Sequence, residues 1–173
     1  MIRFVLPELR RIENSFSQMI VMYRFEELTP FRGIASLVDW RLHGHLSRMT
    51  IEGFFSGSNT QPLLMPLGRF FPQQFLLLLG LGKRETFNES IVAERLGETF
   101  EIARQLKLTD LILSLPGRVE NVCSAGDAID WFIDAYDKQT DMDDMCIIES
   151  TKAQKQMSPA VERWRLRGLV PEI

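Results

Sequence analysis

Basic residues stand next to glycine in three connections, each of which follows a predicted strand. The connections contain Arg32-Gly33, Gly80-Leu81-Gly82-Lys83-Arg84 and Gly117-Arg118. Glycine lets backbone amides approach an anion closely, and arginine pairs well with phosphate or carboxylate groups. Ligands of layered α/β folds bind at the carboxyl ends of strands, where such loops lie. If the three loops share one edge, we expect a basic rim for an anionic ligand. Solvated loop arginines are the alternative.

Other residue types predict little chemistry. His43 and His45 lie two positions apart in a helical pattern, so their side chains diverge by about 200° and cannot share a metal ion there. Cys123 and Cys146 form no CxxC pair and are predicted to be reduced thiols. The sequence has no nucleophile elbow, HExxH, Walker A or GxGxxG motif. We therefore expect no catalytic residue, no metal site and no cofactor.

The C-terminal segment 158–168 is predicted to be a linker-like helix with a basic and apolar surface. Ser158 has the character of an N-cap, Pro159 suits the first helical position, and Gly168 suits the end. A packed terminal helix is one interpretation, and a helix that faces a partner is the other. The acidic stretch 127–144 of a second copy is one candidate partner. The residues expected to contact a partner are Val161, Arg163, Trp164 and Arg167.

Hydrophobic patterns predict alternating strands and helices. Apolar runs predict strands at 2–6, 19–25, 63–67, 75–79, 111–115 and 145–148. Helical periodicity predicts helices at 35–52, at 87–107 after a Thr86/Glu89 capping box, from Ser124 onward, and from Ser158 onward. Segment 10–17 reads as a turn, run 63–67 as an edge strand and run 75–79 as a central strand. This order favours an α/β layered fold with a mostly parallel or mixed sheet.

Composition limits the class of protein. The chain has 173 residues, 20 basic and 23 acidic side chains, a net charge of −3 and 45% hydrophobic residues. These values fit a single globular domain over residues 1–173 and give no global attraction to nucleic acid or to an acidic membrane. No apolar run approaches the roughly 20 residues of a membrane span, and the N-terminus does not resemble a signal peptide. We expect a soluble, cytoplasmic protein.

Several stretches resemble the N-terminal domain of the leucyl aminopeptidase family. The resemblance rests on four stretches: GIASLVDWRLHGHLS at 33–47, EGFFSG at 52–57, LLMP at 63–66 and FLLLLGLGK at 75–83. In addition, segment 160–171 is similar to the linker helix that precedes the family's catalytic domain. The resemblance implies a macro-domain-like fold, which is a three-layer α/β/α sandwich with a mixed sheet.

The resemblance also implies a function. The family's two-metal peptidase site lies in its C-terminal domain, whose Asn-Thr-Asp-Ala-Glu-Gly-Arg signature does not occur in these 173 residues. The chain is therefore expected to be a non-catalytic binding or assembly module. In the family this domain supports oligomer assembly and, in some bacterial members, contacts DNA, so self-association, a protein partner or, more weakly, DNA is expected. The alternatives are a binder of ADP-ribose or another nucleotide at the arginine–glycine rim and an ADP-ribose hydrolase, for which Asp39, Gly44 and His45 occupy the corresponding region.

Overall fold

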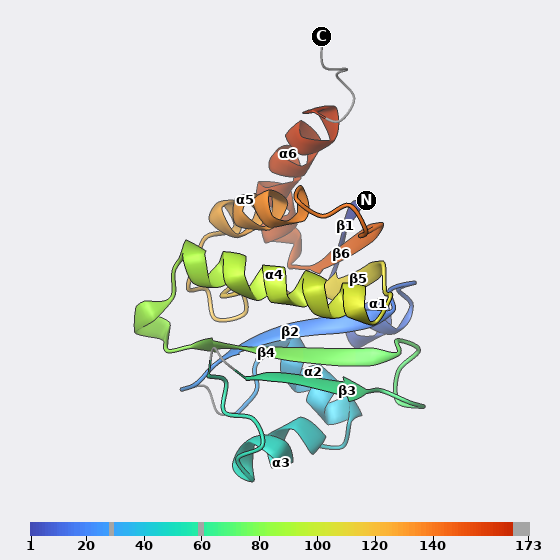
Figure 1. The fold of residues 1–173 in the computed structure, drawn as a ribbon, viewed down its shortest axis with the longest axis vertical. Helices are drawn as coiled ribbons and strands as arrows, with labels where there is room; N and C mark the ends of the chain where they lie inside the picture. Colours follow the sequence, from blue (N-terminus) through green and yellow to red (C-terminus); the bar gives the residue numbers. More distant parts are fainter. Residues whose placement is uncertain (28–29, 59–60, 168–173) are drawn as a thin grey trace.

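The computed structural model describes residues 1–27, 30–58 and 61–167 (Figure 1). Its centre is a six-stranded sheet in the order β1-β6-β5-β2-β4-β3. All neighbouring strands are parallel except β3, which pairs antiparallel with β4 at one edge. The mixed sheet predicted from the sequence is confirmed. The strands are β1 (Ile2–Val5), β2 (Met19–Phe25), β3 (Pro62–Pro66), β4 (Phe75–Gly82), β5 (Asp110–Leu113) and β6 (Asp144–Ile148).

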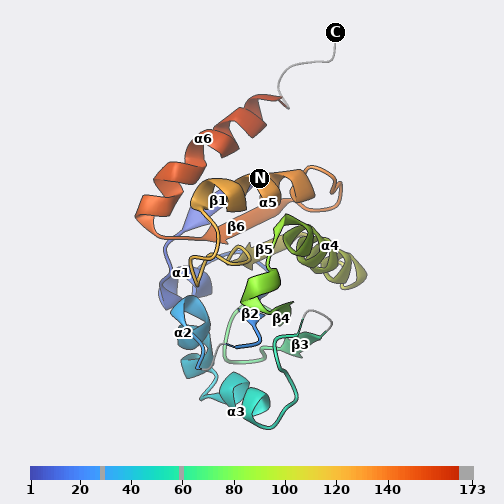
Figure 2. The same cartoon turned by 90° about the vertical axis from the view of Figure 1, so that its left-hand side faces the viewer.

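Helices cover both faces of the sheet, which makes three layers (Figure 2). One face packs against α1 (Leu9–Glu13), α2 (Gly33–Arg41) and α3 (His45–Ile51). The other packs against α4 (Glu89–Gln105), α5 (Ala125–Tyr136) and α6 (Thr151–Arg167). A short 3-10 helix, Arg84–Thr86, follows β4. Within the described residues, no helix combines the length and the apolar character needed to cross a lipid bilayer.

The sheet separates two apolar cores that share its strands. Every residue of β2 is buried, and alternate side chains enter opposite cores, since successive side chains of a strand point to opposite faces. Ile20 and Met22 pack towards α2, whereas Val21 and Tyr23 pack towards α4. Strands buried on both faces show continuous apolar runs, which explains the sequence patterns of β2 and β4.

The predicted single helix over 35–52 is wrong, because the chain turns between α2 and α3. His43 and Gly44 adopt φ values of 56° and 73°, in the left-handed region that ends a helix. The Asp39 carboxylate accepts hydrogen bonds from the backbone amides of Leu46 (2.8 Å) and Ser47 (3.2 Å). This buried carboxylate caps the start of α3 and stabilises the turn.

The predicted start of the last helix at Ser158 is also wrong. The helix α6 begins at Thr151 and includes Pro159, which is exposed. The Ser150 hydroxyl accepts a hydrogen bond from the Ala153 amide at 3.3 Å, which places the helix start near Ser150. Residues before and after the proline bury the same helix face: Ala153, Met157, Ala160 and Val161. The predicted end at Gly168 lies outside the described residues.

Two local details of the prediction change as well. Segment 10–17 contains most of α1, whose Ile12 is fully buried, rather than a turn alone. Helix α4 is capped by Asn88, which accepts from the Ile91 amide at 3.2 Å, rather than by a box from Thr86. The predicted Ser124 cap of α5 is confirmed, because its hydroxyl accepts from the Asp127 amide at 3.0 Å.

Candidate functional site

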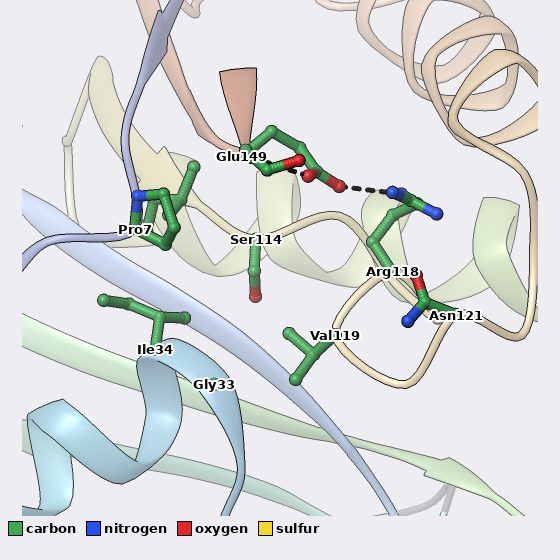
Figure 3. Close-up of a pocket in the computed structure, with 10 residues that line it drawn as sticks. Pro7, Gly33, Ile34, Ser114, Arg118, Val119, Asn121 and Glu149 are labelled. Atoms are coloured by element: carbon green, nitrogen blue, oxygen red, sulfur yellow. Dashed lines mark hydrogen bonds and ion pairs between the residues drawn. The ribbon is translucent and has the colours of Figure 1, made fainter. Parts of the chain in front are cut away.

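A cleft lies where the parallel strands end. Strands β1, β6, β5, β2 and β4 run in one direction, so their carboxyl ends meet at one edge of the sheet. The cleft has a volume of about 280 Å³ and is drawn in Figure 3. Such edges are where α/β folds bind ligands. Its lining residues are Pro7, Gly33, Ile34, Ser114, Arg118, Val119, Asn121, Ile148, Glu149 and Ser150.

Ser114 places a free hydroxyl in this cleft. It follows β5 directly, and only 4% of its surface is exposed. Its side chain points into the space between Ile34 and Val119 (Figure 3). Across the described ranges, no protein atom accepts from or donates to the Ser114 hydroxyl. The hydroxyl borders the cleft, so it is available to a ligand or a water molecule.

One wall of the cleft is a nearly buried ion pair. Arg118 Nε lies 2.7 Å from Glu149 Oε1, and the two side chains are 12% and 9% exposed. Arg118 also donates to the Cys123 carbonyl oxygen at 2.8 Å, and the other Glu149 oxygen accepts from the Ser150 amide at 2.9 Å. The two opposite charges compensate each other, so this wall is polar without a free cation.

Two helix N-termini face the cleft. Gly33 is the first residue of α2, and Ser150 directly precedes α6; both line the cleft. Helix N-termini have unpaired amides and a positive potential. The α2 terminus has no side-chain cap and no acidic residue in its first turn, so its potential is not neutralised locally. At α6, the Glu149 carboxylate lies beside the terminus and is already paired with Arg118.

A close contact between two loops limits the cleft on one side. Gly33 has φ +55°, and a Cβ there would lie 2.9 Å from Val119 Cγ1. A larger residue at position 33 would therefore push the loop after β5 away. Beyond this contact lies a smaller hollow lined by residues that include Arg24, Arg32 and Glu120.

The structure divides the predicted basic rim into two places. All three loops lie on one edge of the sheet, as the hypothesis required. Arg32 and Arg84 are exposed near Glu120, whereas Arg118 turns to Glu149 in the cleft. Burial raises the pKa of Glu120, and the charges of Arg84, Arg32 and Arg24 act in the opposite direction. The free cations therefore flank the smaller hollow rather than the main cleft.

Arg24 belongs to this edge but was not among the predicted site residues. It lies in β2, is 3% exposed, and its guanidinium sits 4.5 Å from the centre of the Phe31 ring. Its Nη1 donates to Thr50 Oγ1 at 3.1 Å, while its Nε and Nη2 have no hydrogen-bond partner. Burial lowers the pKa of Arg24. The signal in the sequence is one arginine inside the otherwise apolar run MIVMYRF.

The remaining glycines of the predicted rim make room for packing instead of lining the cleft. A Cβ on Gly80 would overlap the Ser58 carbonyl oxygen, and the Gly82 amide donates to the Gly57 carbonyl at 3.0 Å. Gly117 has φ +74°, and a Cβ there would lie 2.6 Å from Phe87 Cζ. Lys83 is exposed directly after β4.

The residues weighed for hydrolysis do not assemble at the cleft. Asp39 is buried and caps α3, and the hydroxyl of Ser47 donates to its second oxygen. Gly44 precedes α3 and His45 is its first residue, with an exposed side chain, and neither lines the cleft. In residues 1–27, 30–58 and 61–167, no group of three His, Cys, Asp or Glu side chains is placed to hold a metal ion.

The predicted partner helix contributes to the core and to the surface. Val161 is 2% exposed and packs in this chain's own core. The Trp164 ring is half-buried against Tyr136, with ring centres 5.5 Å apart, and its Nε1 donates to Asp137 Oδ1 at 2.9 Å. Arg163 and Arg167 are exposed.

The six-stranded mixed sheet between two helical layers, with a cleft at its carboxyl edge, is a macrodomain-like fold. The macrodomain of Oceanobacillus iheyensis with ADP superposes with a TM-score of 0.71 and 11% identity, over 90% of this chain and 88% of that chain. The macrodomain of Mycobacterium tuberculosis DarG gives a TM-score of 0.69 and 12% identity, over 87% of this chain and 99% of that chain. At such identities the likeness shows the fold alone.

Residues 20–130 match the N-terminal domain of the cytosol aminopeptidase family, and the chain belongs to this family. The probable cytosol aminopeptidase of Thermosynechococcus vestitus is 36% identical over 92 residues, which are 53% of this chain and 18% of that protein. The corresponding protein of Synechocystis sp. is 33% identical over 94 residues, 54% of this chain and 19% of that protein. The chain thus spans about a fifth of these relatives. A tomato leucine aminopeptidase mutant superposes with a TM-score of 0.63 and 14% identity, over 95% of this chain and 36% of that chain.

Proposed function

We propose that these 173 residues form a non-catalytic binding module whose cleft takes a small anionic ligand of the nucleotide class. The observation that supports the proposal most directly is the unpartnered Ser114 hydroxyl, which opens onto a cleft that the uncapped N-terminus of α2 also faces. A phosphate at the helix terminus would accept from its backbone amides, and Ser114 would donate to a neighbouring ligand oxygen.

The size of the cleft and its surroundings support a nucleotide rather than a larger ligand. Small-molecule pockets commonly measure roughly 300–1,000 Å³, so about 280 Å³ suits a small ligand or one end of a longer one. The exposed Arg32 and Arg84 lie on the same edge and would attract further phosphate groups. ADP is a reasonable probe, because a macrodomain of this fold has been solved with it.

A binding role fits the hydrogen bonds of Glu149, which lines the cleft, and of Asp39, which lies outside it, better than hydrolysis does. Glu149 accepts from both Arg118 and the Ser150 amide, and Asp39 is used to cap α3. Neither is free to act as a general base. Under this proposal, the chain does not hydrolyse a leucyl chromogenic substrate when zinc, manganese or cobalt is added. We further propose a cytoplasmic location, since the curated relatives are cytosol aminopeptidases.

The test is titration calorimetry of the 173-residue chain with ADP, ADP-ribose and inorganic phosphate. We expect ADP or ADP-ribose to bind, and Ser114→Ala to weaken the affinity about five- to tenfold, since one hydrogen bond to the ligand is lost. Ser158→Ala is the matched control, because this serine lies on α6 and donates to Gln154. If neither nucleotide binds, or if both variants bind as tightly as the wild type, the proposed site is wrong.

A further inference from the structure

A second pocket lies between the end of β2 and helix α3, and α3 is at the end of the molecule opposite α6 (Figures 1 and 2). The pocket has a volume of about 280 Å³ and shares no lining residue with the main cleft. Three of its described lining residues are apolar, one is a cation and none is acidic. These residues are Arg24, Pro30, Phe31, Ser47, Thr50 and Ile51.

The cation of this pocket, Arg24, has hydrogen-bonding capacity that the chain does not use. Its guanidinium stacks on Phe31, and its Nη1 donates to Thr50 Oγ1 at 3.1 Å. Its Nε and Nη2 are buried without a hydrogen-bond partner. The charge of Glu120 acts on Arg24, but the two form no ion pair in the described part of the chain. Unpaired buried donors destabilise a fold, so their presence indicates a partner from outside the chain.

The geometry of the two unpaired groups points to a carboxylate as that partner. Nε and Nη2 lie on one edge of the planar guanidinium, where their N–H bonds are parallel and match the two oxygens of a carboxylate. This edge is covered in the free chain. The open pocket beside the flexible arginine leaves room for the change of side-chain rotamer that exposes it, and such changes are common on binding.

The other polar side chains of the pocket are already paired. The Ser47 hydroxyl donates to Asp39, and the Thr50 hydroxyl donates to the Leu46 carbonyl oxygen at 3.0 Å. A ligand with several charged or polar groups would therefore lose its hydration without gaining partners. This disfavours phosphate and nucleotides in this pocket and favours a single charge on an apolar body.

We propose that this pocket binds a small monocarboxylate with an apolar body, of the size of an aromatic or branched-chain acid. The carboxylate accepts two hydrogen bonds from Arg24, and the apolar body packs on Phe31 and Ile51. Ile51 is 83% exposed, so the ligand removes apolar surface from water when it fills the pocket. The volume lies just below the usual range for drug-sized ligands, which suits a ligand of this size. The site is independent of the nucleotide proposed for the main cleft.

Titration calorimetry of the 173-residue chain with benzoate tests the proposal. We expect a dissociation constant of about 0.1–1 mM, and at least about tenfold weaker binding of benzamide, which has nearly the same shape without the charge. Arg24→Met should also weaken benzoate binding at least about tenfold, because the charge and both donors are lost. The matched control is Arg48→Met, which removes the same charge from an exposed position of α3 outside the pocket and should bind benzoate like the wild type.

A second pair of variants leaves the buried arginine in place. Ile51→Glu puts a negative charge at the pocket and should weaken benzoate binding at least about fivefold, whereas Ile51→Lys should bind as tightly as the wild type or more tightly. Circular dichroism should show the wild-type fold for both, since this side chain is exposed.

ADP separates this site from the one proposed for the main cleft. Saturating ADP should leave the affinity for benzoate unchanged, because the two pockets share no lining residue. Competition between them would place benzoate in the main cleft and overturn the proposal. So would a lack of benzoate binding up to about 10 mM, equal binding of benzoate and benzamide, or unchanged binding in Arg24→Met or Ile51→Glu.

Discussion

Single residues decide where segments distant in the sequence can approach each other, and Gly80 is the strongest case. It lies in β4, where a Cβ would overlap the backbone of Gly57 and Ser58. The loop after α3 therefore packs directly on the strand. Sequence reasoning assigned Gly80 to an anion-binding turn, but the structure uses its lack of a side chain for packing.

Replacement of Gly80 by alanine should destabilise the protein strongly. We expect Gly80→Ala to lower the free energy of unfolding by about 3 kcal/mol, because either the strand or the loop must shift. The matched control is Gly97→Ala, in the middle of α4, where nothing lies within 4 Å of an added Cβ. That change should raise stability by roughly 0.5–1 kcal/mol through helix propensity. Urea unfolding of both variants measures their free energies of unfolding. A Gly80→Ala variant as stable as the wild type, or less destabilised than Gly97→Ala, would contradict this account.

The charged residues of the cleft are also paired across segments that are distant in the sequence. Arg118 and Glu149 are 31 positions apart and pair because β5 and β6 are neighbours in the sheet. A pattern in the sequence identifies the arginine as a candidate but not its partner. The pairing converts a predicted free cation into one half of a neutral wall.

At the level of elements, α6 is a long helix that contains a proline. Pro159 lies in its interior, where it lacks the amide for the hydrogen bond to the preceding turn. Packing of Ala153, Met157, Ala160 and Val161 on both sides of the proline maintains the helix. Tertiary burial thus outweighs the local preference for a helix start at this position.

The proline should therefore reduce the stability of the native state. We expect Pro159→Ala to raise the free energy of unfolding by about 1–3 kcal/mol, since the exposed site has room for alanine and regains a backbone hydrogen bond. Gln156→Ala, at another exposed position of α6, should change stability by no more than about 0.5 kcal/mol. Thermal unfolding followed by circular dichroism gives both values. A loss of stability in Pro159→Ala would mean that α6 needs the distortion that proline causes.

The molecule as a whole has two cores but is built around one sheet. Strand β2 contributes to both cores with alternate side chains, so neither core can form without the strands of the other. Helices on one face and helices on the opposite face are therefore coupled through the sheet. This arrangement differs from two domains joined by a linker.

The chain should accordingly unfold in one cooperative transition. We expect the calorimetric and van't Hoff enthalpies to agree for the wild type and for two core truncations, Val38→Ala on the α2 side and Leu96→Ala on the α4 side. Each truncation removes a fully buried side chain and should lower the melting temperature of the entire transition. Two separate transitions in either variant would show that the cores unfold independently.

The sequence alone determined the kind of fold, because burial on both faces of a central strand and on one face of a helix leaves a periodic pattern. The runs at 19–25 and 75–79 and the Ser124 cap were predicted correctly for this reason. The resemblance to the aminopeptidase N-terminal domain was also visible in the sequence and is confirmed by the family match.

Only the tertiary structure decided which side chains meet. The turn at 42–44 depends on the Asp39 cap, the start of α6 depends on burial against α5, and the free hydroxyl of Ser114 depends on which strands end beside it. These outcomes follow from contacts between segments far apart in the chain. A local pattern specifies the hydrophobic face of an element, whereas the partner of a buried polar group is set by the neighbouring strand or helix that the fold brings to it.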